Sequence, residues 1–209
     1  MIQSENFINK KKLILFDLDG VLIDSRPNMM LAWNFVNKKF NLRKSFKEYF
    51  KFIGIPFPDI LQKLGIYKNQ FAIEKCFISK SSSQINLIKA FPYVSKTLSE
   101  LKKKGKIVGI LTSKDIGRTK KILKKIHIKP QVLKCPEPNV PGKPNPFQIL
   151  KILEDANISS DEAVYVGDMY VDFLTANNAN VDFIFVEYGY GKNKNYTYKI
   201  KNISTIFNL

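Results

Sequence analysis

Short apolar runs alternate with helical patterns along most of the chain. Four runs, residues 12–16, 106–111, 163–166 and 181–186, are mostly apolar, and each leads into acidic, hydroxyl or glycine residues. Continuous apolar runs of this length are typical of strands that are buried on both faces of a parallel sheet. Residues 131–133 add a shorter candidate strand, and we expect the run that ends at residue 186 to be the last one.

The segments between these runs have the period of amphipathic helices. Val94, Leu98 and Leu101 fall on one helical face, and Gly105 ends that pattern. Further helices are expected over residues 115–126, 147–156 and 172–178. Strands and helices that alternate in this way predict an α/β fold, a doubly wound, Rossmann-like parallel sheet with helices on both faces.

Residues 25–90 interrupt the alternation with patterns that are helical throughout. Met29, Trp33, Val36 and Phe40 recur at helical spacing and form one apolar stripe. Further helices are expected over residues 46–53, 59–64 and 70–78, with a polar turn at 79–83. We therefore expect two domains, a sheet core formed by residues 1–24 and 91–209 and a small inserted α-helical cap formed by residues 25–90.

The charge of the chain is strongly positive. Among 209 residues, 34 are Lys or Arg and 18 are Asp or Glu, which gives a formal net charge of +16. A basic protein of this kind is a candidate for nucleic-acid binding. Only Arg26, Arg43 and Arg118 are arginines, however, and arginine is the residue that reads phosphates and bases in a bidentate way. The scattered lysines favour a solvated surface over a nucleic-acid partner.

Membrane and secretory classes fit the sequence poorly. No stretch approaches the ~20 uninterrupted apolar residues of a membrane-spanning helix. Residues 1–12 have no apolar core of the kind that a secretory signal needs. Cys76 and Cys135 form no Cys-x-x-Cys motif, which fits a reducing compartment and argues against a thiolate metal site. We therefore expect a cytoplasmic protein without a membrane partner.

Polar residues follow the predicted strands at the points where ligands bind in open parallel sheets. Asp17 and Asp19 follow the first strand, and their spacing places both side chains on one side of an extended chain. Thr112 and Ser113 follow the second long strand, and Lys143 lies in a proline-rich loop further along. This arrangement predicts a site with acidic, hydroxyl and basic groups at one edge of the sheet.

A second acidic pair follows the fourth strand. Asp168 and Asp172 are four residues apart at a helix start, so they share one helical face. Converging carboxylates need compensation, and an all-oxygen cluster selects a hard divalent cation such as Mg²⁺. Lys143 supplies a compact positive charge for phosphate oxygens. Thr112 and the backbone N–H groups at the start of the following helix form an anion-binding site.

These residues resemble the haloacid dehalogenase superfamily, in its aspartate-nucleophile phosphatase branch. The chain matches the four motifs of this superfamily in order. The matching segments are Asp17-Leu-Asp-Gly-Val-Leu-Ile-Asp24, the strand ending in Thr112, Gly142-Lys143-Pro-Asn-Pro146, and Gly167-Asp168 with Asp172. The long gap after the first motif is where a subgroup resembling phosphoglycolate phosphatase and β-phosphoglucomutase inserts a helical cap. The resemblance covers nearly the whole chain.

The resemblance implies a role for each matching residue. Asp17 would attack phosphorus, and Asp19 would protonate the leaving group and then activate water. Thr112, the Ser113 N–H and Lys143 would hold the phosphoryl oxygens. Asp17, Asp168 and the main-chain carbonyl of Asp19 would bind Mg²⁺, and Asp172 would orient Lys143 or a metal-bound water.

The expected function is therefore hydrolysis of a small phosphorylated metabolite, a phosphomonoester, through a phospho-aspartate. A phosphotransferase or mutase on the same core is the nearest alternative, and a basic nucleic-acid-binding protein without turnover is a more distant one. By the same resemblance, Ser25-Arg26 and Ala90-Phe91 would be the cap hinges, and Gly54-Ile-Pro-Phe-Pro58 a substrate-facing loop. His127 is the only histidine, and we expect a structural role for it.

Overall fold

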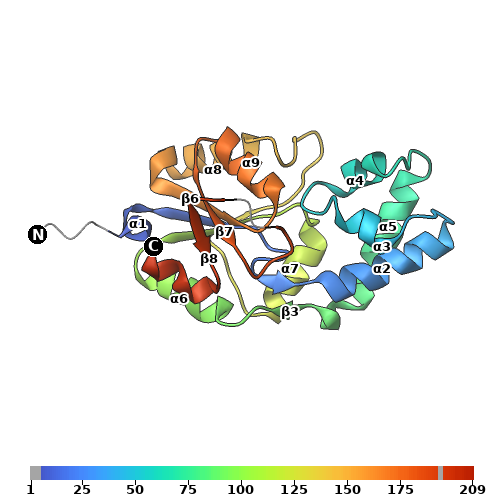
Figure 1. The fold of residues 1–209 in the computed structure, drawn as a ribbon, viewed down its shortest axis with the longest axis horizontal. Coiled ribbons are helices and arrows are strands. Elements are labelled where there is room, and N and C mark those ends of the chain that lie inside the picture. The colour runs from blue at the N-terminus through green and yellow to red at the C-terminus, as the bar shows by residue number, and fades with distance from the viewer. Residues whose placement is uncertain (1–5, 193–194) are drawn as a thin grey trace, which may run out of the picture.

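The computed structural model describes residues 6–192 and 195–209, and its centre is a six-stranded parallel sheet (Figure 1). The strand order is β5-β4-β1-β6-β7-β8, and every neighbouring pair is parallel. The strands are β1 (Leu13–Phe16), β4 (Ile107–Leu111), β5 (Val132–Lys134), β6 (Ala163–Gly167), β7 (Asp182–Val186) and β8 (Tyr198–Ile200). The predicted α/β fold with a doubly wound parallel sheet is confirmed.

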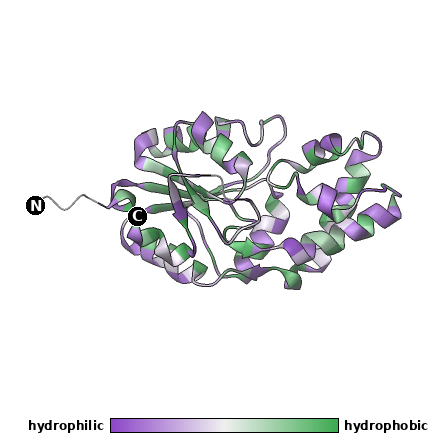
Figure 2. Ribbon diagram, in the orientation of Figure 1, coloured by the Kyte–Doolittle hydropathy of each residue, from purple (hydrophilic) through white to green (hydrophobic). Residues whose placement is uncertain are grey.

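Helices cover both faces of this sheet and enclose two apolar layers. One layer lies under α6 (Val94–Lys103), α7 (Ile116–Lys125), the short α1 (Phe7–Lys10) and the 3-10 helix η3 (Ile203–Asn208). The other lies under α8 (Phe147–Ala156) and α9 (Tyr170–Asn178). The 3-10 helix η2 (Ser160–Glu162) follows α8 and leads into β6. Figure 2 shows the central strands as hydrophobic, between helices with mixed surfaces, whereas the edge strand β8 is largely hydrophilic.

Strand β1 explains why the sequence runs are continuously apolar. Ile14 and Phe16 pack in the layer of α6 and α7, whereas Leu13 and Leu15 pack in the layer of α8 and α9. All four side chains are fully buried. Because side chains alternate along a strand, a strand with a layer on each face has no polar position.

A helical insert lies to one side of the sheet and has an apolar cluster of its own. It contains α2 (Arg26–Lys39), α3 (Phe46–Phe50), α4 (Phe57–Lys63), α5 (Gln70–Ser83) and the 3-10 helix η1 (Ile85–Leu87). The predicted stripe of Met29, Trp33 and Val36 is buried in this cluster, with Phe40 at its margin. An antiparallel ribbon of β2 (Ile23–Asp24) and β3 (Lys89–Ala90) joins the insert to the sheet.

Four expectations about elements were wrong. The helix expected over residues 46–53 ends at Phe50, and the expected loop of residues 54–58 is shorter because α4 already begins at Phe57. The run ending at Val186 is not the last strand, because β8 follows it at the sheet edge. Only Ile200 of β8 is buried, so the sequence there lacks the apolar run of a central strand. Helix α5 does not end before a turn at residues 79–83, because Ser81 is buried and donates a hydrogen bond to Asn28 Oδ1 at 2.6 Å.

The described helices contain no candidate for a membrane span. Within residues 6–192 and 195–209, none combines the length and the apolar character that crossing a bilayer requires.

Candidate active site

Three neighbouring strands deliver the predicted residues to one edge of the sheet. Strand β1 lies between β4 and β6, and Asp17, Thr112 and Asp168 directly follow these three strands. Because the strands are parallel, their carboxyl ends meet at the same edge. The structure therefore brings together side chains that are up to 151 positions apart in the sequence.

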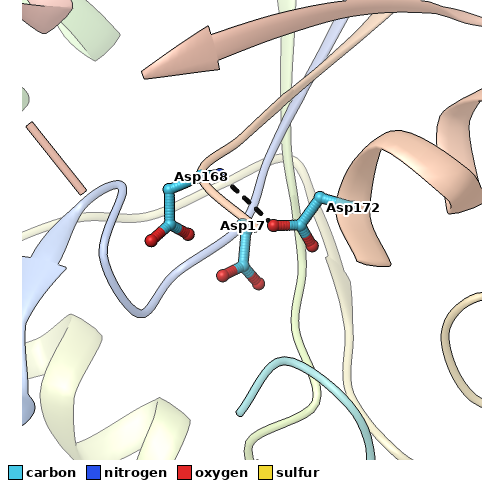
Figure 3. A group of neighbouring side chains, drawn as sticks. All are labelled: Asp17, Asp168 and Asp172. Carbon is cyan, nitrogen blue, oxygen red and sulfur yellow. Dashed lines mark hydrogen bonds between the residues drawn. The ribbon is translucent and has the colours of Figure 1, made fainter. Parts of the chain in front are cut away.

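A buried acidic trio forms the centre of the site (Figure 3). Carboxylate oxygens of Asp17, Asp168 and Asp172 lie within 4.8 Å of one another, and all three residues are buried. Burial raises the pKa of Asp17 to about 7, although Lys143 opposes this shift. Burial also raises the pKa of Asp168 well above its ordinary value, and the charges of Asp172 and Asp17 add to the effect.

Lys143 is the counter-charge of the trio. Its Nζ lies 2.8 Å from Asp17 Oδ1 and 2.8 Å from Asp172 Oδ1. Burial alone would lower the pKa of Lys143, but the two carboxylates outweigh burial and hold that pKa above its ordinary value. One ammonium group faces three carboxylates, so the centre retains an excess of negative charge when all of them are ionised.

Asp172 also fixes the start of helix α9. Its Oδ2 accepts hydrogen bonds from the backbone N–H of Asp168 at 3.3 Å and of Met169 at 3.0 Å, and Figure 3 shows the first of these. The same carboxylate holds Lys143 through Oδ1. Asp172 therefore connects the backbone at the end of β6 and the start of α9 to Lys143.

One carboxylate oxygen of Asp168 lacks a hydrogen-bond partner among the described residues and could bind a cation. Asp168 Oδ1 is buried and has no hydrogen-bond partner among the described residues, while Oδ2 accepts from Tyr190 N at 2.6 Å. A buried carboxylate oxygen without a partner costs free energy unless a ligand occupies that position. The donors are all oxygen atoms with excess negative charge, which suits a hard divalent ion such as Mg²⁺.

The Asp19 carboxylate is not part of the acidic trio, although Asp19 lines the same cavity as Asp17 and its charge raises the pKa of Asp17. Its Oδ2 is 3.1 Å from Lys114 Nζ, and its Oδ1 accepts a hydrogen bond from the Ser25 hydroxyl. Lys114 is buried, which lowers its pKa, while the charge of Asp19 opposes that shift. The sequence reasoning missed Lys114 and Ser25 as partners, although Lys114 directly follows Thr112-Ser113 at a predicted strand end.

The two hydroxyl residues after β4 have different local roles. Thr112 Oγ1 accepts a hydrogen bond from Lys114 N at 3.2 Å, which folds the segment before α7 into a compact turn. The Ser113 hydroxyl instead donates to Gly54 O of the insert at 2.7 Å. The side chain of Ser113 is thus used to contact the insert, and only its backbone N–H remains as a candidate for holding a phosphoryl group.

A small cavity of about 50 Å³ adjoins this edge of the sheet. Asp17, Asp19 and Thr112 line its polar end, together with Lys114 and Arg118. Most of the remaining wall belongs to the insert, and its side chains are largely apolar. These residues are Met29, Tyr49, Ile53, Gly54, Ile55, Phe57, Ile60 and Phe77. The cavity can therefore hold only a small group beside the carboxylates.

Arg118 is a second cavity residue that the sequence reasoning did not assign. Its guanidinium lies 5.3 Å from the centre of the Phe77 ring and donates to Ser81 Oγ at 3.0 Å, so it connects helix α7 to the insert. Asp115 pairs with it and caps the start of α7. His127 is exposed beyond the end of α7 and does not line this cavity.

Comparison with known proteins identifies the family. The family description "haloacid dehalogenase-like hydrolase" matches residues 14–186, which is most of the chain. The chain belongs to this family. It is therefore a hydrolase, and its curated relatives carry the names of phosphatases, so phosphatase activity is supported.

Individual relatives and structures agree with this assignment. The chain is 29% identical to phosphoglycolate phosphatase of Aquifex aeolicus, over 80% of this chain and 81% of the relative. It is 27% identical to pyrophosphatase PpaX of Oceanobacillus iheyensis, over 81% and 80% of the two chains. Among solved structures, a hydrolase from Pseudomonas syringae shares the fold with a TM-score of 0.85, at 20% identity over 95% of this chain and 96% of that one.

Proposed function

We propose that the protein is a Mg²⁺-dependent phosphatase that hydrolyses a small phosphomonoester through a phospho-aspartate at Asp17. The observation that carries the proposal is the buried trio of Asp17, Asp168 and Asp172 with Lys143 bound between two of its members. Family membership supports the same reaction class. Phosphoryl transfer depends chiefly on positioning and electrostatic stabilisation, and this cluster supplies both.

Asp17 is the proposed nucleophile, and Lys143 holds its carboxylate in place. Lys143 also offsets the charge that a phosphate group brings next to Asp17. Asp17, Asp168 and the main-chain carbonyl of Asp19 would hold Mg²⁺, with Asp172 orienting the lysine. When bound, the ion supplies positive charge that neutralises the carboxylates and the phosphoryl oxygens.

Asp19 is the proposed acid and base. Its partners Lys114 and Ser25 hold its carboxylate at the polar end of the cavity, where a leaving group would lie. It would donate a proton to the leaving alkoxide and later accept one from the attacking water, a role that contributes typically 10²–10⁴-fold to rate. Thr112 and the backbone N–H of Ser113 are the proposed seat of the phosphoryl oxygens.

Residues 25–90 are the proposed cap domain, joined to the sheet core of residues 1–24 and 91–209. Ser25-Arg26 and Ala90-Phe91, which adjoin the ribbon of β2 and β3, would act as its hinges. Gly54 and Ile55 of the loop before α4, and Phe57 at the start of α4, contribute to the cavity wall. A cavity of about 50 Å³ favours a leaving group of a few atoms. The free thiols Cys76 and Cys135 fit a reducing compartment, so we place the reaction in the cytoplasm.

The proposal is tested by phosphate release from a panel of sugar phosphates, phosphoglycolate, nucleotides and pyrophosphate, with Mg²⁺ or with EDTA. We expect release from a small phosphomonoester that EDTA abolishes and that Asp17→Asn lowers by at least about 10³-fold. Asp59→Asn, on the exposed surface of α4, is the matched control and is expected to retain full activity. Activity that survives Asp17→Asn would overturn the proposal, and faster transfer to a sugar than to water would indicate a phosphotransferase.

A further inference from the structure

Tyr190, in the loop between β7 and β8, contacts both the acidic trio and residues 24–26, the linker that leads into the insert. Its backbone N–H donates to Asp168 Oδ2 at 2.6 Å. Its phenol oxygen accepts hydrogen bonds from Ser25 N at 2.7 Å and from Arg26 N at 3.1 Å. One residue of the sheet core thus bonds to a proposed metal ligand and to the first residues of the linker and of helix α2.

The phenol group makes hydrogen bonds with all three residues of the linker. It has one proton and two acceptor lone pairs, and the proton is available for Asp24 Oδ1 at 3.0 Å. The Ser25 side chain makes no capping bond to α2, and its hydroxyl donates to Asp19. Tyr190 therefore accepts the N–H of Ser25, and it shares the N–H of Arg26 with Asp24 Oδ1, which lies 3.1 Å from the same nitrogen.

The loop lies so close to Asp168 that only glycine fits beside Tyr190. A Cβ atom at Gly189 would lie 2.3 Å from Asp168 Cβ, and one at Gly191 would lie 1.8 Å from Asp168 O. On the other side, the ring of Phe50 in helix α3 lies 5.2 Å from the Tyr190 ring, centre to centre. Tyr190 is therefore packed between the acidic centre and the insert.

We propose that Tyr190 is a positioning residue that couples the geometry of Asp168 to the linker and so to the placement of the cap. The inference rests on the proposed function, because it requires a metal ion at Asp168 and a cap of residues 25–90 that moves relative to the sheet. A cap that turns away displaces Ser25, which breaks the contact of Ser25 with Tyr190 and its contact with Asp19 together. A cation that orders Asp168 fixes the Tyr190 loop and thereby holds the linker in the arrangement that this structure has.

The test is amide hydrogen exchange of Ser25 and Arg26 with and without Mg²⁺, in the wild type, Tyr190→Phe and Tyr188→Phe. Tyr190→Phe removes the phenol but keeps the ring and the backbone N–H. Tyr188→Phe is the matched control in the same loop, because the Tyr188 hydroxyl donates to Val21 O at 2.9 Å and bonds to neither Asp168 nor the α2 start.

In the wild type we expect Mg²⁺ to slow exchange of these two amides by roughly three- to tenfold, the range that one hydrogen bond gives. Tyr188→Phe is expected to keep this protection and Tyr190→Phe to lose it at Ser25, with the Mg²⁺ affinity from calorimetry nearly unchanged. Arg26 is the less sensitive of the two amides, because its N–H also donates to Asp24 Oδ1. A residue that only stabilised the fold would lower the melting temperature of Tyr190→Phe without removing Mg²⁺-dependent protection. Protection that persists in a folded Tyr190→Phe protein, or that is absent from a wild type that binds Mg²⁺, overturns the proposal.

Failure of the proposed function gives a different result. A wild type that neither binds Mg²⁺ nor releases phosphate overturns the proposed function and the coupling together, whereas an active, Mg²⁺-binding enzyme without the exchange effect overturns the coupling alone. If Tyr190→Phe does not fold, Phe50→Leu tests the same coupling from the cap side, because it removes the ring that packs on Tyr190. The readout is then the Ser25 amide alone, because the Arg26 guanidinium also lies 4.8 Å from the centre of the Phe50 ring. Reduced protection in Phe50→Leu supports the proposal, and unchanged protection overturns it.

Discussion

Lys114 Nζ lies 3.1 Å from Asp19 Oδ2, and the lysine side chain is only 3% exposed. A buried charge is stable only with a partner, so each of these residues restricts the position of the other. Ser25 restricts the Asp19 carboxylate from the second side through its hydroxyl group. The proposed acid and base is thus held by one residue of the sheet core and one residue of the cap linker.

The first prediction concerns this ion pair. Lys114→Met is expected to lower kcat by about 10- to 100-fold, because Asp19 loses the partner that positions it for proton transfer. The Mg²⁺ affinity is expected to stay unchanged, since Lys114 contacts none of the acidic trio. Steady-state kinetics with calorimetry measure both, and Lys120→Met, on the exposed face of α7, is the control. A raised KM with unchanged kcat would assign Lys114 to substrate binding instead.

The second prediction concerns the pH dependence of stability without metal. Burial raises the pKa of Asp17 from its ordinary value of 3.8 to about 7, so between these values the folded protein binds more protons than the unfolded chain. The contribution of Asp17 to the free energy of unfolding therefore falls as pH rises from about 4 to about 7. Asp168 acts in the same direction, because its pKa is also raised by burial.

Urea unfolding in EDTA at several pH values measures this slope. Asp17→Asn is expected to have a shallower slope, and added Mg²⁺ is expected to stabilise the wild type more at pH 7.5 than at pH 5.5, because the ion binds ionised carboxylates. Equal slopes for the wild type and Asp17→Asn would show that Asp17 titrates normally in the folded protein.

The third prediction concerns the glycine that ends β6. A Cβ atom at Gly167 would lie 2.4 Å from Asp172 Cβ, so Gly167→Ala must displace Asp172 and, with it, Lys143. We expect phosphate release to fall by roughly 10- to 100-fold, the usual cost of disturbing a residue that orients a metal site. Gly117→Ala in α7 is the control, because its Cβ would meet only Asp115 Oδ1, at 3.4 Å. Similar activities for both variants would contradict this placement of Asp172.

The fourth prediction concerns the cavity wall. Ile60 lines the cavity from helix α4, whereas its neighbour Leu61 is equally buried but does not line it. Each change to Ala is expected to lower stability by about 2–5 kcal/mol. Only Ile60→Ala is expected to improve kcat/KM for bulkier phosphomonoesters relative to the smallest substrate. An unchanged preference in Ile60→Ala would mean that this part of the wall does not contact the leaving group.

Local patterns determined most of the fold. Helix α8 lies over the predicted residues 147–156, and β1, β4, β6 and β7 lie within one residue of the predicted runs at each end. Strand β8 escaped prediction because an edge strand with one buried residue has no apolar run. Helix α5 extends past the predicted end at residue 78 because Ser81 donates a hydrogen bond to Asn28, which lies 53 positions away in the sequence.

The sequence by itself placed Asp17, Thr112 and Asp168 at one edge, because the carboxyl ends of neighbouring parallel strands must meet. Only the tertiary structure decided which of those groups touch. It separated Asp19 from the acidic trio, paired it with Lys114 and joined Tyr190 to Ser25, 165 positions away. Periodicity reports which face of an element is buried, whereas these pairings depend on how distant elements pack against one another.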